Sequence, residues 1–273
     1  MVAASGTRAS VDACLRAIEE ASGSFTEEIA QLSAVEWDTP SNCPPLRVRD
    51  IAVHLVTSGE GFVVAVLRGL NGSVEPVVGD GTRQRELAAA DTSIVAGALD
   101  AVTAEFVGCY AGLSEDQLAM LCFHRRGNRS VAWYAFHRLA EVAFHAWDVH
   151  TSLRRGAELA EPMAALLLPT LLESNAPRIY AAGLSAERGR GERIAFVVEA
   201  EPSTSWLVTI RPDAMAVTRD HEPADLTVTG SPAALALLVY GRRRLPDLEA
   251  SGAVRVAGDR ALVERFALVF PKP

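Results

Sequence analysis

Two side chains that could bind a metal ion lie four residues apart in "RLAEVAFHAWDVH", residues 138–150. The apolar residues around them predict a helix, and on a helix positions i and i+4 face the same way. Glu141 and His145 could therefore hold one ion between them. Arg138 lies three residues before Glu141 and Asp148 three residues after His145, so either could orient a ligand from behind or form an ordinary helical ion pair.

The third ligand should come from a facing helix, because catalytic zinc usually has three protein ligands. His54 in "RDIAVHLVTSGEGF" is the candidate, since it lies among apolar residues that would face a core. His137 is an equally good local partner for Glu141. His137 and His145 would lie about 12 Å apart along a helix, so one ion cannot easily bind both, and the spacing does not choose between them. A core histidine or a surface helical pair gives the same pattern.

Two basic clusters interrupt an otherwise acidic chain, "HRRGNR" at 124–129 and "GRRRLP" at 241–246. Each is typical of a solvated loop, and each could also be a local site for carboxylates. Arg242 in the second cluster is a candidate for holding such a carboxylate. The remaining histidines have no matching partner in the sequence: His124, His150 and His221.

Length and composition indicate a cytoplasmic protein of two domains. The chain has 273 residues, is 49% hydrophobic and carries a net charge of -8, which disfavours nucleic-acid binding. The sequence predicts no signal peptide and no membrane span, and four scattered cysteines predict neither a disulfide framework nor a thiolate zinc site. Lys272 is the only lysine among 26 basic residues, a bias that indicates a GC-rich, actinobacterial source.

The hydrophobic pattern changes near residue 158. Helical periodicity over 8–33, 47–69, 83–111 and 130–154 predicts a four-helix bundle in residues 1–158. Residues 159–273 predict a small α+β domain of three helices and four strands. Its helices are expected at 161–174, 231–241 and 259–270, and its strands at 193–200, 205–212, 224–230 and 254–256.

Three segments together resemble the mycothiol-dependent maleylpyruvate isomerase family. "CPPLRVRDIAVHL" at 43–55 is similar to the family pattern C-P-G-W-x-V-R-D-L-x-x-H-L, and the segment at 138–150 is similar to R-x-x-E-x-x-x-H-A-W-D. Residues 224–270 resemble the family's C-terminal, sterol-carrier-like domain. The resemblance implies a DinB-like four-helix bundle followed by an α+β sterol-carrier-like domain. It also implies that His54, Glu141 and His145 hold zinc, and so it prefers His145 to His137.

The resemblance implies a metal-dependent enzyme that uses mycothiol as a thiol cosubstrate, with Zn²⁺ or another divalent transition metal lowering the thiol pKa. Arg242 would then hold a carboxylate of mycothiol or substrate, and Arg138 and Asp148 would support the ligands. Leu46 and His150 depart from the family pattern, which favours thiol transfer to another electrophile over maleylpyruvate isomerisation. Isomerisation, hydrolysis and non-catalytic ligand binding remain alternatives. The expected partners are a small thiol and an electrophilic substrate, and the chain would be a monomer or a homodimer.

Overall fold

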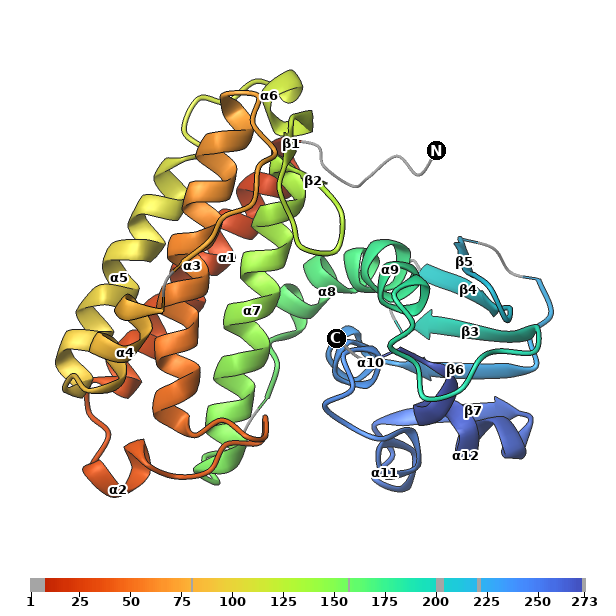
Figure 1. Ribbon diagram of the computed structural model, residues 1–273. Coiled ribbons are helices and arrows are strands. Elements are labelled where there is room, and N and C mark those ends of the chain that lie inside the picture. The colour runs from red at the N-terminus through yellow and green to blue at the C-terminus, as the bar shows by residue number, and fades with distance from the viewer. Residues whose placement is uncertain (1–7, 80, 157, 200–203, 220–221, 272–273) are drawn as a thin grey trace. The chain divides into compact units, whose positions relative to one another are not determined.

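The computed structural model describes residues 8–79, 81–156, 158–199, 204–219 and 222–271. The chain divides into two compact units, residues 1–158 and 159–273. The first unit is helical and the second contains a β-sheet (Figure 1). This arrangement confirms the predicted fold class of a helical part followed by an α+β part.

The first unit is built on four long helices. Each packs against two of the others, in the cyclic order α1, α5, α3, α7, so the four enclose one core. Their bounds are Arg8–Ile29 for α1, Val48–Leu70 for α3, Thr92–Gly108 for α5 and Val131–Ser152 for α7. The shorter elements are α2 (Ala34–Trp37), α4 (Thr82–Ala88), α6 (Glu115–Ala119), β1 (Leu121–Cys122) and β2 (Arg129–Ser130).

The prediction of one helix over 83–111 was wrong. The chain leaves the helical conformation at residues 89–91 and divides this stretch into α4 and α5. Asp91 has the extended backbone (φ −71°, ψ 158°) of a residue that precedes a new helix. The expected helix over 8–33 likewise ends earlier, at Ile29, because Ser33 caps the separate short helix α2 through a hydrogen bond with Glu36.

Helix α3 is long and apolar enough to cross a membrane, judged by length and composition alone. Half of its most apolar window is buried inside the helical unit, and the core helix of a bundle has the same length and composition. Its buried side includes Ile51, Leu55 and Val66, and Gly69 approaches the backbone of β1.

The second unit is a five-stranded sheet with helices packed against it. The strand order is β5-β4-β3-β6-β7, and every neighbouring pair is antiparallel except β3 and β6. Residues alternate between buried and partly exposed along β3, so Ile194, Phe196 and Val198 face the core. Phe196 contacts Phe270 at a ring distance of 5.6 Å, which packs the C-terminal helix region onto the sheet.

Sequence periodicity missed two elements of this unit, β5 (Met215–Thr218) and α11 (Leu245–Ala250). The strands β3, β4, β6 and β7 span Glu192–Val198, Thr204–Ile210, Leu226–Gly230 and Val254–Gly258. The helices α10 and α12 span Pro232–Val239 and Arg260–Val269. The helix predicted over 161–174 continues to Ala181, as α8 (Glu161–Thr170), the π-helical turn η1 (Leu171–Asn175) and α9 (Ala176–Ala181).

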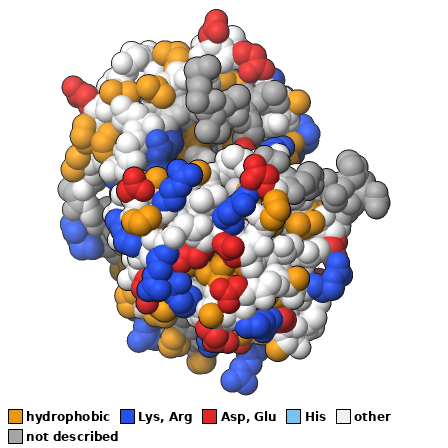
Figure 2. Space-filling model, turned by 90° about the vertical axis from the view of Figure 1, so that its right-hand side faces the viewer, with side chains coloured by type: hydrophobic (Ala, Val, Ile, Leu, Met, Phe, Trp, Pro, Cys, Tyr) orange, Lys and Arg blue, Asp and Glu red, His pale blue; other side chains and the backbone are white. Residues whose placement is uncertain are grey.

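Basic and acidic side chains are interspersed on the molecular face shown in Figure 2. Within the second unit, Arg260 pairs with Glu249 at 2.7 Å, and Arg265 pairs with Glu187 and Glu192 at 3.1 and 3.0 Å. The charges of these two arginines are therefore neutralised locally.

Candidate metal centre

Helices α3 and α7 pack against each other (Figure 1), and this packing brings His54 to Glu141. The His54 Nε2 atom lies 2.9 Å from Glu141 Oε2, and His145 Nε2 lies 3.7 Å from the same oxygen. The His54 and His145 rings meet edge to face with centroids 5.1 Å apart. The structure thus joins the three residues that the sequence suggested, one from α3 and two from successive turns of α7.

The three donor atoms fit a divalent transition metal. All of them lie within 4.8 Å of one another, and donors around a tetrahedral zinc ion lie about 3.3 Å apart for bonds of about 2.0 Å. The side chains of Glu141 and His145 are 13% and 11% exposed, whereas that of His54 is 40% exposed. The donor set therefore opens toward solvent on the His54 side, as a site needs if it is to admit an external ligand.

Glu141 is ionised in this environment. Burial by itself would raise the pKa of its carboxyl group, but the hydrogen bond with His54 and the electrostatic influence of the neighbouring imidazoles hold that pKa well below its usual range. An anionic carboxylate with two imidazoles is a typical donor set for catalytic zinc.

Asp148 supports His145 from inside the core. The His145 Nδ1 atom lies 3.2 Å from Asp148 Oδ2, and Asp148 is fully buried. This contact leaves Nε2 of His145 directed at Glu141 and fixes the ring, as carboxylates behind metal-binding histidines commonly do.

Cys43 is a feature that the sequence did not single out. Its sulfur belongs to a second group of possible ligands, with His145 and Asp148, whose donor atoms also lie within 4.8 Å of one another. An ion there would have to separate Asp148 from the His145 ring. The group with His54 keeps that contact and is more open to solvent, so it is the better candidate. The cysteine at the start of "CPPLRV" was the available signal.

Arg138 is completely buried between the helices rather than at the metal donors. Its Nη1 donates to the carbonyl oxygen of Leu55 at 2.7 Å, next to His54 in the chain. Its Nε and Nη2 have no hydrogen-bond acceptor in the part of the chain that the structure describes. A Cβ on Gly59 would lie 3.1 Å from the guanidinium, so the glycine provides its space. Burial lowers the pKa of Arg138 to about 10, although the negative charge of Glu141 acts to raise that pKa. The side chain is therefore cationic at neutral pH.

His137 does not join the donor group. It packs against Trp133 and Phe62, with ring centroids 4.5 and 4.9 Å away. Two neighbouring rings therefore hold this imidazole one turn before Glu141, outside the group of donor atoms that could share an ion.

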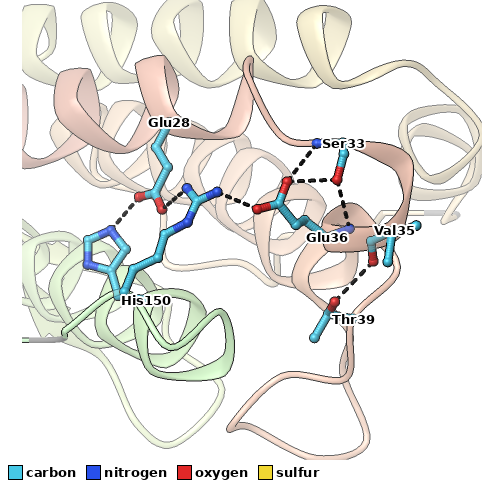
Figure 3. A network of polar contacts seen from close by, with 7 residues as sticks. Glu28, Ser33, Val35, Glu36, Thr39 and His150 are labelled. Carbon is cyan, nitrogen blue, oxygen red and sulfur yellow. Dashed lines mark hydrogen bonds and ion pairs between the residues drawn. The ribbon is translucent and has the colours of Figure 1, made fainter.

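Two histidines that lacked a partner in the sequence have one in the structure. His150 contacts Glu28 on α1, and Glu28 also accepts a hydrogen bond from Arg155 at 2.8 Å (Figure 3). His124 accepts a hydrogen bond from the backbone N–H of Arg126 at 3.1 Å through Nδ1. The sequence could not show the contact of His150 because its partner lies 122 residues away in the chain. His221 lies outside the described residues.

Arg242 belongs to the second compact unit, after α10. Its guanidinium lies over the Tyr240 ring, 5.1 Å from the centroid. The expected role of Arg242 in binding a carboxylate stays a prediction.

Comparison with known proteins identifies the chain along most of its length. Residues 16–150 match the model of the mycothiol maleylpyruvate isomerase N-terminal domain, and residues 174–265 match the model of its C-terminal domain. No curated protein matches the sequence.

Solved structures with the same fold include a mycothiol-dependent maleylpyruvate isomerase, at 15% identity and a TM-score of 0.61, with 96% of each chain covered. A point mutant of that isomerase matches at 14% identity, with the same TM-score and coverage. Sterol Carrier Protein 2 from Yarrowia lipolytica matches at 17% identity and a TM-score of 0.29, over 37% of this chain and 84% of its own. With both domain models matched in order, the chain belongs to the mycothiol maleylpyruvate isomerase family.

Proposed function

We propose that this protein is a cytoplasmic enzyme that uses a divalent metal ion, zinc, to activate mycothiol for transfer to an electrophile. The observation that carries the proposal is the meeting of His54, Glu141 and His145 at one solvent-accessible point of the helical unit. Two neutral imidazoles and one carboxylate hold the ion in this proposal. When bound, the ion supplies positive charge that lowers the pKa of a thiol and favours the thiolate at neutral pH.

The surrounding residues keep the donors in place. Asp148 accepts a hydrogen bond from Nδ1–H of His145 and so selects the tautomer whose Nε2 is free to bind an ion. Arg138 fastens α7 to the turn of α3 that carries His54, through the Leu55 carbonyl. Neither residue reaches solvent, so both act in this proposal as positioning residues rather than as direct contacts of the thiol.

The fate of the thiol separates our proposal from its main alternative. In transfer, sulfur bonds to one carbon of the electrophile's double bond and the thiol proton ends on the neighbouring carbon. In isomerisation, the thiol leaves again and the product has the substrate's mass. Family membership favours isomerisation as the second candidate. The departure at Leu46 supports transfer, because Leu46 lies in the same short loop as Cys43, which approaches His145.

The departure at His150 does not support either reaction. His150 contacts Glu28 on α1, away from the donors that face α3. The histidine at position 150 therefore serves the packing of α7 against α1. The argument for a different substrate rests on Leu46.

The deciding experiment incubates the zinc-loaded protein with mycothiol and a panel of electrophiles that contain activated double bonds, followed by mass spectrometry. Transfer gives a product heavier than the electrophile by the mass of mycothiol, and isomerisation gives a product of unchanged mass with altered chromatography. Consumption of substrate without added thiol would instead indicate hydrolysis. Protein that purifies without stoichiometric metal, gains none on incubation and turns over no substrate would refute the enzyme proposal in favour of ligand binding.

A further inference from the structure

Four planar side chains form a stack beside the candidate metal centre. The His137 imidazole lies between Trp133, at 4.5 Å and an interplanar angle of 27°, and Phe62, at 4.9 Å and 38°. The Arg129 guanidinium lies over the Trp133 ring at 5.7 Å. We call these four residues the ring stack. Phe62, His137 and Arg129 are each partly exposed, so the ring stack is accessible from outside the core.

The ring stack continues the same two helical faces that carry the metal donors. On α3, His54, Ser58 and Phe62 follow at intervals of four residues. On α7, His137 comes one turn before Glu141, about 6 Å along the helix axis. A molecule whose reactive carbon lies at the metal donors would therefore extend over the ring stack if it continued along the α3 and α7 pair.

Gly61 leaves open space on the face of α3 that carries His54 and Phe62. A Cβ built on Gly61 would meet no atom within 4 Å, and Gly61 lies seven residues after His54, on the same face of α3. Glycine weakens the interior of a helix relative to alanine. Local packing therefore does not require glycine here, in contrast to Gly59, whose missing side chain leaves room for Arg138.

The β1–β2 hairpin brings positive charge to the ring stack. Among the described residues, no carboxylate pairs with Arg125, Arg126 or Arg129. The Nε atom of Arg129 is buried without an acceptor, and burial lowers the pKa of its guanidinium. His124, in the same hairpin, meets the His137 ring edge to face at 5.7 Å. Uncompensated cations beside aromatic rings favour an anionic, planar ligand.

We infer that the ring stack, which includes Arg129, binds the electrophile together with Arg125 and Arg126 of the β1–β2 loop, and that this electrophile carries both an unsaturated ring and an anionic group. This assignment rests on the proposed function, which places the thiol at the metal donors. The guanidinium groups pair with the anion, and the rings of the ring stack contact the flat part of the substrate. Neither contact requires the second compact unit.

Three related electrophiles separate these two features. Benzoylacrylate carries a ring, an activated double bond and a carboxylate; acetylacrylate lacks the ring, and the methyl ester of benzoylacrylate lacks the charge. With mycothiol and the zinc-loaded protein, we expect the KM for benzoylacrylate to be about 10-fold lower than for either relative, the equivalent of one charged hydrogen bond or one aromatic contact.

Single substitutions test which residues cause the preference for benzoylacrylate. Arg129→Gln should raise the KM for benzoylacrylate about 10-fold and leave the KM for its ester unchanged. Phe62→Leu should raise the KM for both benzoyl compounds about 5-fold and spare acetylacrylate. Arg16→Gln and Val64→Ala, which change exposed side chains on α1 and α3, are the matched controls and should behave as the wild type.

Binding of an unreactive probe tests the site without turnover. Naphthoate should bind the wild type at least about 10-fold more tightly than cyclohexanecarboxylate and should lose that advantage in Arg129→Gln and Phe62→Leu. Equal binding of the two probes, or variants of unchanged melting temperature that keep the preference, would overturn the inference. If naphthoate binds selectively but no electrophile is converted, the proposed function fails while the binding site is supported.

Discussion

Helix α7 carries two clusters of histidine and carboxylate that use the same residue types differently. Toward α3, Glu141 lies between two imidazoles and is partly open to solvent. Toward α1, His150 and Arg155 share the carboxylate of Glu28 (Figure 3). Both carboxyl groups are held ionised, because in each case their neighbours outweigh the effect of burial on the pKa.

The difference lies in where the positive charge comes from. In the cluster toward α1, which we call the second cluster of α7, Arg155 binds Glu28 and also donates a hydrogen bond to Glu36 at 2.6 Å. No described guanidinium pairs with Glu141, because the nearby Arg138 donates to the Leu55 carbonyl instead. A cluster whose cation is part of the chain is a structural ion-pair network. A cluster whose carboxylate has no paired guanidinium group is suited to bind a cation from solution.

Neutralising each carboxylate gives the largest expected contrast. Glu141→Gln should lower metal affinity at least about 100-fold, since loss of a supporting contact alone costs about 10- to 100-fold, and thiol-dependent activity should fall with it. Glu28→Gln should retain stoichiometric metal. Elemental analysis after dialysis against a chelating buffer measures both, and equal metal loss in the two variants would contradict the distinction between the clusters.

A smaller effect is expected from the buried support of the first cluster. Asp148→Asn keeps the size of the side chain but weakens its hydrogen bond with His145, and should reduce metal affinity about 10- to 100-fold. Competition with a chromogenic chelator gives the affinity. Asp100→Asn, on the exposed face of α5, is the control; an unchanged affinity in Asp148→Asn would show that His145 is oriented by other contacts.

Arg138→Met should separate positioning from stability. Methionine fills similar space without the buried N–H groups that lack acceptors, so the free energy of unfolding of the metal-free protein should rise by about 1 kcal/mol. Metal affinity should nevertheless fall several-fold, since the hydrogen bond from α7 to the Leu55 carbonyl oxygen beside His54 is lost. Urea unfolding and chelator competition on the same samples test both directions, and a large loss of stability would show that Arg138 is required for folding.

The smallest effect concerns the pH dependence of the second cluster. Burial opposes ionisation of Glu28, but contacts with His150 and Arg155 lower its pKa below the usual value. Its stabilisation is therefore present above the unfolded-state pKa of about 4.3 and is lost as the pH falls through the lower folded-state pKa. Glu28→Gln should remove about 1 kcal/mol of stability at pH 7. Unfolding curves between pH 7 and pH 3 should converge for wild type and variant, and a constant difference would contradict this linkage.

Periodicity predicted the long helices of the first unit well because each buries one continuous stripe. Helices α3 and α7 start and end within two residues of their predicted limits. It failed at residues 89–91, where alanine gave no signal of a break between α4 and α5. The short strand β5 was missed because four residues at a sheet edge carry too little alternation to recognise.

The candidate site was predictable only in part, for a similar reason. Local spacing could pair Glu141 with His137 or His145, and only the rings of Trp133 and Phe62 show why His137 is held elsewhere. The partners of His150 and the approach of Cys43 to His145 depend on contacts between distant segments. Such contacts follow from helix packing, which no local pattern encodes.

The space that Gly59 provides for the Arg138 guanidinium links the evolutionary histories of two positions. A methyl group at residue 59 would crowd both that guanidinium and Val102, at 3.1 Å each. Where the arginine is retained, Gly59→Ala should be deleterious. Once the arginine has been replaced by a smaller or more flexible side chain, the same alanine should be less harmful, because only the contact with Val102 would still be crowded. The cost of the alanine would then depend on the order in which the two substitutions arise, an instance of epistasis within a helix pair.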